Sequence, residues 1–174
     1  IDLSAVTQAD GVVAVITAQE VPGHIDIGPV FPGDPVLVDK ECEFIGQPIF
    51  AVAAHSHEQA CQAVKLAAID YEVLAPVLTI EQAKRAEFYV RPPHQHERGD
   101  AKSAIASAPH KLTGELKIKG QEHFYLEGQI SMASPTEDNG MTVFTSSQHP
   151  GEVQKLVAEV LDIDVFILYF YVRR

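Results

Sequence analysis

Gln148 is the residue whose type and position most clearly suggest chemistry in this sequence. It follows a segment expected to form a strand and precedes one expected to begin a helix, and ligands often bind at such junctions. A side-chain amide donates and accepts hydrogen bonds at once and carries no charge. It can therefore stabilise charge developing on a neighbouring group without forcing a proton transfer. From spacing alone, a purely structural role stays open.

The other residues that could carry chemistry are weaker candidates. His94 and His96 would face the same way on an extended segment, but a second group of ligands at metal-binding spacing is missing. Glu122 and His123 are adjacent, so on a strand they would point to opposite faces rather than act as an acid–base pair. The common phosphate-binding, nucleophile-elbow, zinc-protease and paired-cysteine motifs are absent. We therefore expect no metal ligated directly by this sequence.

The composition excludes several classes of partner. Thirteen Lys+Arg against 24 Asp+Glu give a formal charge of −11, which disfavours binding to nucleic acids or to anionic membranes. No apolar run approaches the roughly 18 residues of a membrane-spanning helix. The two cysteines, Cys42 and Cys61, suit a reducing compartment better than a disulfide framework. We expect a cytoplasmic protein with no nucleic-acid or membrane partner.

The elements that must position Gln148 lie in the last third of the sequence. Residues 125–133 and 141–147 are strand candidates, and Asn139-Gly140 between them is a strong hairpin signal. Pro150 suits the first turn of a helix. A final apolar run at 165–172 predicts another strand. Gln148 is thus expected between a strand and a helix.

The earlier residues are predicted to alternate between strands and helices. Residues 11–17 are a continuous β-rich apolar run, which predicts a buried strand, and residues 43–54 predict two strands around a tight turn. Ser56 begins a capping box and therefore a helix. Residues 70–74 predict the next strand. This order suggests a βαβ-like unit in the first hundred residues.

Two more short helices and a strand are predicted before a domain boundary. Thr79 and Asp100 are suited to cap the helices, and alternating apolar residues at 111–118 predict the strand. We place the domain boundary close to Lys119-Gly120. The mixture of elements predicts an α+β fold.

A loop rich in proline and glycine runs from Gly28 to Pro35. Three prolines and two glycines in eight residues cannot hold a regular ladder of backbone hydrogen bonds. The loop carries Val30 and Phe31, which are unusual side chains for a solvated loop. Two interpretations stay open: Phe31 pins the loop to the core, or the loop offers an apolar wall to a ligand.

Four short runs act as sequence motifs. They are Gly-Gln-Glu-His-Phe-Tyr-Leu-Glu at 120–127, Ser-Ser-Gln-His-Pro at 146–150, Ile-Gly-Gln-Pro-Ile at 45–49 and Tyr-Glu-Val-Leu-Ala-Pro-Val at 71–77. Together they resemble the molybdenum-binding subunit of the xanthine dehydrogenase family, over about residues 1–161. The first run is more typical of xanthine dehydrogenases than of aldehyde or carbon monoxide oxidoreductases.

The resemblance implies an α+β fold, with an a/b hammerhead domain at 1–117 and a truncated molybdopterin-binding domain at 118–174. It implies a role in purine catabolism, the oxidation of hypoxanthine to xanthine and of xanthine to urate at a molybdenum–pterin cofactor. Electrons would leave through 2Fe-2S clusters and FAD to NAD, on a partner subunit or on other domains. The implied assembly is a homodimer of protomers that each include the Fe-S/FAD subunit.

The resemblance also implies roles for particular residues. Gln148 takes the position of the family glutamine that hydrogen-bonds an oxygen ligand of the molybdenum. Val30 and Phe31 fall in the loop that edges the substrate channel. The family's glycine-rich cofactor stretch, its general-base glutamate and its purine-holding arginine are not in this sequence, so we expect no catalytic residue in this segment.

The sequence begins at Ile1 without Met and without a basic region before an apolar stretch, so no signal peptide is expected. We expect an interior piece of a longer enzyme that, in isolation, has no activity and binds no molybdenum. Two alternatives stay open: a related hydroxylase of the aldehyde oxidase type, and a non-catalytic structural module when isolated.

Overall fold

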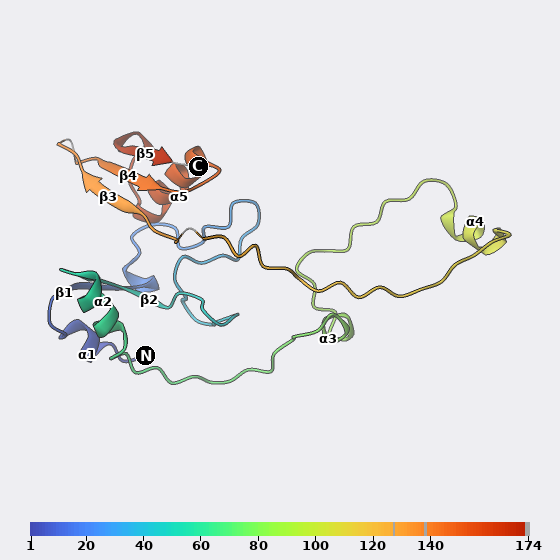
Figure 1. Ribbon diagram of the computed structural model, residues 1–174, viewed down its shortest axis with the longest axis horizontal. Helices are drawn as coiled ribbons and strands as arrows, with labels where there is room; N and C mark the ends of the chain where they lie inside the picture. The colour runs from blue at the N-terminus through green and yellow to red at the C-terminus, as the bar shows by residue number, and fades with distance from the viewer. Residues whose placement is uncertain (127, 138, 173–174) are drawn as a thin grey trace. The chain divides into compact units, whose positions relative to one another are not determined.

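The protein, seen here as a computed structural model, is described for residues 1–126, 128–137 and 139–172. The chain divides into two compact units, one made of Ile1–Asp70 with Leu126–Arg174 and the other of Tyr71–Tyr125. In the described part of the chain, short helices alternate with strands that form two small sheets, which confirms the α+β class (Figure 1).

The first sheet contains two strands, β1 (Val12–Thr17) and β2 (Phe50–Ala54), which pair antiparallel. Around it lie the helices α1 (Ser4–Thr7) and α2 (His57–Val64) and the 3₁₀ helix η1 (Ala18–Glu20). Val6 of α1 and Ala63 of α2 are almost completely buried and form the small core of this part. Burial of such side chains is the main stabilising contribution available to so small a sheet.

Three predictions for the first hundred residues are wrong. Residues 43–54 form one strand, β2, rather than two around a turn, because residues 43–49 join no sheet. β1 is not buried on both sides, because Val13 and Ile16 remain exposed in a sheet of only two strands. The βαβ-like unit is not formed, because β1 and β2 are antiparallel and residues 70–74 make no strand. The helix start at Ser56 is confirmed, since its hydroxyl oxygen accepts from the Gln59 N–H (3.2 Å).

The second sheet has the order β3 (Met132–Pro135), β4 (Met141–Thr145) and β5 (Leu168–Val172). β3 and β4 form the predicted hairpin, although β3 overlaps the strand predicted at 125–133 only at residues 132 and 133. Asn139 has the left-handed φ of 56° that such a turn requires, and the Thr136 N–H donates to the Gly140 carbonyl (2.9 Å). β4 and β5 are parallel. The helix α5 (Pro150–Leu161) and the 3₁₀ helix η2 (Val165–Ile167) connect them, so the βαβ unit of this chain lies here.

Helix α5 is attached to β5 by a side chain as well as by apolar packing. Pro150 stands in its first turn as predicted. Gln154, partly buried, donates from Nε2 to the carbonyl oxygens of Val165 (3.2 Å) and Leu168 (2.7 Å). Leu168 is almost completely buried. The amide therefore satisfies two backbone acceptors where the chain leaves η2 and enters β5.

Replacing Gln154 with alanine is expected to destabilise this unit by about 1–3 kcal/mol, because the two carbonyls lose their donor. The midpoint of thermal inactivation of the full-length enzyme would measure the loss. Lys155→Ala is the matched control, since it removes only an exposed ion pair with Glu159 (3.4 Å). Equal midpoints for the two variants would contradict the stabilising role of the amide.

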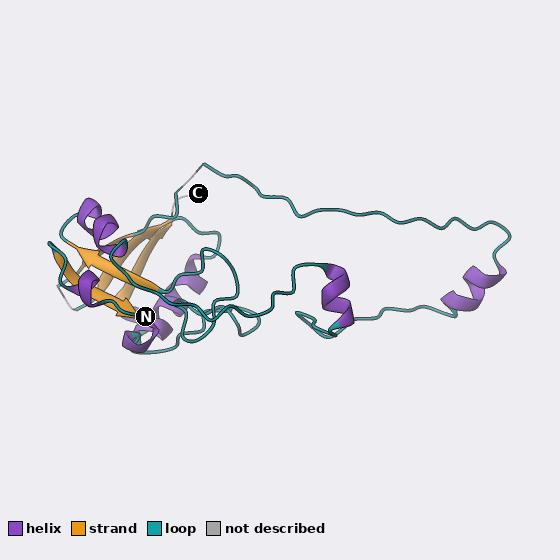
Figure 2. Ribbon diagram, turned by 90° about the horizontal axis from the view of Figure 1, so that it is seen from below, coloured by secondary structure: helices purple, strands orange, loops and turns teal. Residues whose placement is uncertain are grey.

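The unit of residues 71–125 contains two short helices and extended chain (Figure 2). Thr79 forms a complete capping box with Gln82 at the start of α3 (Ile80–Arg85), and Asp100 accepts from the Ser103 N–H (3.0 Å) at the start of α4 (Ala101–Ser107). Both predicted caps are confirmed. The strand predicted at 111–118 is wrong, because no strand lies beside it in the part of the chain that the structure describes.

Candidate functional site

Gln148 lies in the loop between β4 and α5, three residues after the strand ends and two before the helix begins. Its side chain is exposed and has no hydrogen-bond partner among the described residues. Its position between a strand and a helix is as expected from the sequence. A neutral amide that is exposed in this way can bind a polar group from outside the chain.

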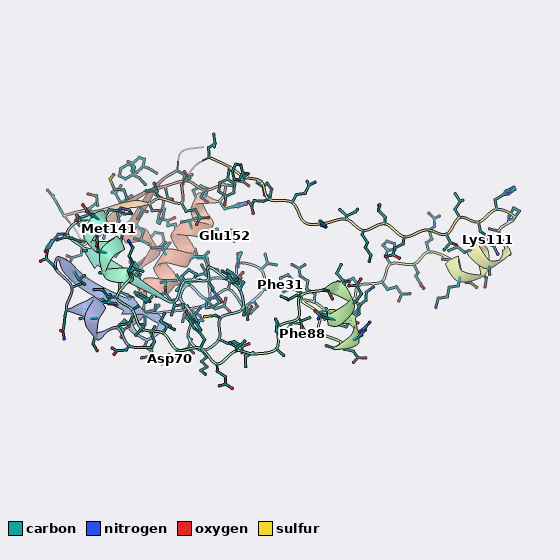
Figure 3. All side chains as sticks on the ribbon, turned by 60° about the horizontal axis from the view of Figure 1, so that its bottom comes forward. Phe31, Asp70, Phe88, Lys111, Met141 and Glu152 are labelled. Carbon is teal, nitrogen blue, oxygen red and sulfur yellow. The ribbon has the colours of Figure 1, made fainter. Side chains whose placement is uncertain are left out.

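The backbone around Gln148 is held by local hydrogen bonds. The Ser147 hydroxyl oxygen accepts from the His149 N–H (3.0 Å). The His149 carbonyl accepts from the N–H groups of Glu152 (3.1 Å) and Val153 (3.0 Å), which starts α5. Figure 3 labels Glu152 on this helix. These contacts hold the loop backbone in place, and none of them involves the Gln148 side chain.

The chemistry of this loop suits a neutral contact rather than direct metal ligation. Residues 145–151 include no Asp, Glu, Lys or Arg. A Cβ placed on Gly151 would meet nothing within 4 Å, so the start of α5 is open on that side. Across the described residues, no group of three or more His, Cys, Asp and Glu side chains could hold a metal ion. A loop without charged side chains suits a neutral hydrogen-bonding contact.

The second predicted pair, Val30 and Phe31, lies in the loop from Gly28 to Pro35, which has no regular structure, as expected. Val30 is 75% exposed and Phe31 is 50% exposed. Phe31 is therefore half-buried and half-exposed, so part of its side chain packs within the chain and part is accessible. The accessible part is apolar surface of the kind that can line a ligand site.

Asp26 organises this loop, and sequence reasoning missed it. Its Oδ1 accepts from the N–H groups of Gly28 (2.9 Å) and Asp34 (3.3 Å), and its Oδ2 accepts from Gly33 (2.7 Å). The Gly28 bond, followed by the Gly33 bond, holds the pKa of Asp26 below its ordinary value of 3.8. An Asp two residues before a Gly at the start of a Pro/Gly loop is the signal that could have identified it.

Helix α5 also connects the two candidate segments. The N–H groups of Gly23 and His24, just before the Asp26 loop, donate to the carbonyls of Val160 (3.0 Å) and Glu159 (2.8 Å) in the last turn of α5. The Gln148 loop enters the other end of this 12-residue helix, which is about 18 Å long. Gln148 and the Val30–Phe31 loop therefore belong to one unit and are attached to opposite ends of one helix.

The remaining residues considered for chemistry lie in the other unit. His94, His96, Glu122 and His123 are all exposed. The Glu122 carboxylate accepts from the His123 backbone N–H (3.1 Å), which is a local backbone contact rather than an acid–base arrangement of the two side chains.

None of the helices in the described part of the chain is long and apolar enough to cross a membrane.

Two protein families match this chain. Residues 1–75 match the family described as "Aldehyde oxidase and xanthine dehydrogenase, a/b hammerhead domain". Residues 81–166, which include Gln148, match the family described as "Molybdopterin cofactor-binding domain". The two matches together span most of the sequence and contain both candidate segments.

Curated relatives include xanthine dehydrogenases and aldehyde oxidases. The chain is 38% identical to a xanthine dehydrogenase of Dictyostelium discoideum over 163 residues, which is 94% of this chain and 12% of that protein. It is 35% identical to aldehyde oxidase 2 of Macaca fascicularis over 176 residues, which is 100% of this chain and 13% of that protein. The chain thus spans about an eighth of the length of these relatives.

Solved structures share the fold. The aldehyde oxidoreductase of Desulfovibrio gigas superposes with a TM-score of 0.82 at 22% identity, covering 99% of this chain and 21% of that one. The quinoline 2-oxidoreductase of Pseudomonas putida 86 superposes with a TM-score of 0.78 at 20% identity, covering 98% of this chain and 24% of that one. At these identities the likeness establishes the fold.

Proposed function

The chain belongs to the family of aldehyde oxidases and xanthine dehydrogenases, and we propose on that premise that it is part of the molybdenum-cofactor subunit of a xanthine dehydrogenase. The whole enzyme would oxidise hypoxanthine to xanthine and xanthine to urate. Electrons would pass through 2Fe-2S clusters and FAD to NAD, on a partner subunit or on other domains. The working assembly would be a homodimer of such protomers in the cytoplasm.

The observation that carries this proposal is the exposed amide of Gln148 within the segment that matches a molybdopterin cofactor-binding domain. When bound, the molybdenum–pterin cofactor supplies the redox chemistry that no side chain of this segment can supply. Gln148 would donate a hydrogen bond to an oxygen ligand of the molybdenum. A neutral donor there stabilises negative charge and leaves the protonation of that oxygen unchanged.

Val30 and Phe31 would lie at the edge of the channel through which the purine reaches the cofactor. Their exposed apolar surface supports this role, because flat aromatic substrates bind against apolar walls. In this proposal the segment contributes no catalytic residue. Residues 1–117 would form the a/b hammerhead domain, and residues 118–174 would form the first part of the molybdopterin-binding domain. The catalytic base and the groups that hold the purine would come from other parts of the enzyme.

An aldehyde oxidase type of hydroxylase is the second candidate function. The observation that favours it is the 35% identity to aldehyde oxidase 2, which extends over all of this chain. Both candidates use the same cofactor, so Gln148 would have the same role in each. They differ in the groups that recognise the substrate.

Steady-state oxidation of xanthine and of an aromatic aldehyde by the full-length holoenzyme tests the proposal. We expect kcat/KM for xanthine to exceed that for benzaldehyde, and the preference is reversed if the aldehyde oxidase candidate is correct. The 174-residue chain alone is expected to bind no molybdenum and to show no xanthine-dependent dye reduction. Oxidation of neither substrate by a molybdenum-loaded enzyme would refute both candidates.

A further inference from the structure

We propose that Asp26 is a positioning residue that holds the Val30–Phe31 loop in its substrate-facing conformation and thereby sets the apparent affinity for substrate. This inference rests on the proposed function of Val30 and Phe31 as channel residues. Asp26 would touch neither substrate nor cofactor. It would act only through the backbone of the loop.

The hydrogen bonds of Asp26 join the two ends of the loop. Gly28 lies at its beginning, Gly33 and Asp34 lie at its end, and all three N–H groups donate to the one carboxylate. Val30 and Phe31 are at the tip between these contacts. Backbone pairs close the base of the loop, from Ile27 N–H to the Asp34 carbonyl (2.9 Å) and from Val36 N–H to the Ile25 carbonyl (2.8 Å).

The tip itself is folded tightly against the start of the loop. A Cβ placed on Gly28 would lie 2.0 Å from the Phe31 carbonyl oxygen and 3.1 Å from Asp26 Oδ1. Only glycine therefore permits this approach of the Phe31 backbone. The conformation that displays Phe31 depends on two independent features, the Asp26 carboxylate and the missing side chain at Gly28.

The carboxylate is ionised in the whole neutral pH range. Its pKa is lowered by hydrogen bonds made in the folded state, so its contribution is present above the ordinary pKa of 3.8 and is lost only as the pH falls through the lower folded value. The loop contacts are thus in place at the pH of ordinary assays. Their loss by mutation should have the same effect throughout that range.

A loop without these contacts would sample many conformations, and the substrate would have to order it on binding. The free-energy cost of ordering the loop weakens binding of the substrate and of the transition state by the same amount. Such a uniform loss raises KM and leaves kcat unchanged. A role for Asp26 in the chemical step or in cofactor loading would instead change kcat or the molybdenum content.

The test is steady-state kinetics of full-length holoenzyme variants with their molybdenum content measured. Asp26→Ala is expected to raise KM for the purine about ten-fold, with kcat within about two-fold of the wild type. Asp26→Asn keeps the Oδ1 acceptor and loses the bond from Gly33, so a smaller rise is expected. Asp39→Asn is the matched control, because this exposed aspartate only approaches Lys40, at 4.0 Å.

Two further variants separate positioning from general destabilisation. Gly28→Ala should reproduce the KM effect of Asp26→Ala by a different change, and it keeps the inference testable if Asp26→Ala fails to fold. When Asp26→Ala is added to Phe31→Ala, KM should rise by a further factor of less than about two, because the side chain that Asp26 positions is already absent. An independent effect of the two substitutions would overturn the inference.

The outcomes distinguish this inference from the proposed function. An active wild-type enzyme with unchanged KM in Asp26→Ala and Gly28→Ala would refute the positioning role alone. A reduced kcat at unchanged KM would refute it as well. A molybdenum-loaded wild-type enzyme that oxidises neither purines nor aldehydes would refute the proposed function, and the inference would fall with it.

Discussion

Replacement of Gln148 by alanine in the intact enzyme is expected to lower kcat about 10- to 100-fold, the usual cost of losing an outer-shell partner of a metal centre. The side chain is exposed and makes no hydrogen bond with described residues of its own chain, so the loss should not reflect unfolding. Turnover per bound molybdenum is the quantity to measure. An unchanged kcat at unchanged molybdenum content would contradict the role of this amide.

The matched control is Gln62→Ala, which removes another exposed glutamine of the same compact unit, on α2. No loss of turnover is expected for it. Gln148→Glu adds a second diagnostic, since an ionised carboxylate of the same shape cannot donate a hydrogen bond. Its activity should be at least as low as that of Gln148→Ala and should recover partly when the glutamate is protonated at lower pH.

Gly23→Ala is expected to destabilise the unit by about 2–4 kcal/mol, by forcing backbone apart and breaking two hydrogen bonds. A Cβ on Gly23 would lie 2.0 Å from the Glu159 carbonyl oxygen and 2.9 Å from the Asp162 nitrogen. The chain must therefore move away from the end of α5, and the N–H groups of Gly23 and His24 lose their acceptors. The midpoint of thermal inactivation of the full-length enzyme measures the effect.

Gly114→Ala is the control for this substitution, because nothing lies within 4 Å of a Cβ at that position. It should leave the midpoint nearly unchanged. A higher KM is also expected for Gly23→Ala, since residues 23 and 24 attach the Asp26 loop to α5. Equal midpoints for Gly23→Ala and Gly114→Ala would show that the attachment does not stabilise the unit.

The features that the sequence predicted well are those stabilised by neighbours in the chain. Ser56, Thr79 and Asp100 each accept from an N–H three residues later, at the start of a helix. The turn at Asn139 likewise depends on its own conformation and on the residues beside it. Such short-range hydrogen bonds follow from local residue types, so the pattern alone was sufficient.

Strand pairing was predicted less well because it depends on distant partners. Residues 70–74 and 111–118 have strand-like patterns, yet no described strand lies beside them to complete a ladder. A pattern of apolar residues indicates two faces and does not identify the neighbour. The βαβ unit was placed too early for the same reason: β4 and β5 form it, whereas β1 and β2 pair antiparallel.

In the candidate site, too, local features could be predicted from the sequence and long-range contacts could not. The position of Gln148 followed from the local sequence of strand, turn and helix. The role of Asp26 did not, because its acceptor oxygens are used by N–H groups seven and eight residues away, at the far end of a loop. The contact between Gly23 and α5 joins segments more than a hundred residues apart in the sequence. Only the folded chain brings these groups together.

The most direct test is an experimental structure of the holoenzyme with its molybdenum cofactor bound, in which the distance from Gln148 Nε2 to the nearest oxygen ligand of the molybdenum is measured. We predict a hydrogen bond of about 2.7–3.2 Å. A Gln148 side chain directed away from the cofactor, with neither a direct contact nor a bridging water, would contradict the assignment of this segment to the molybdenum site.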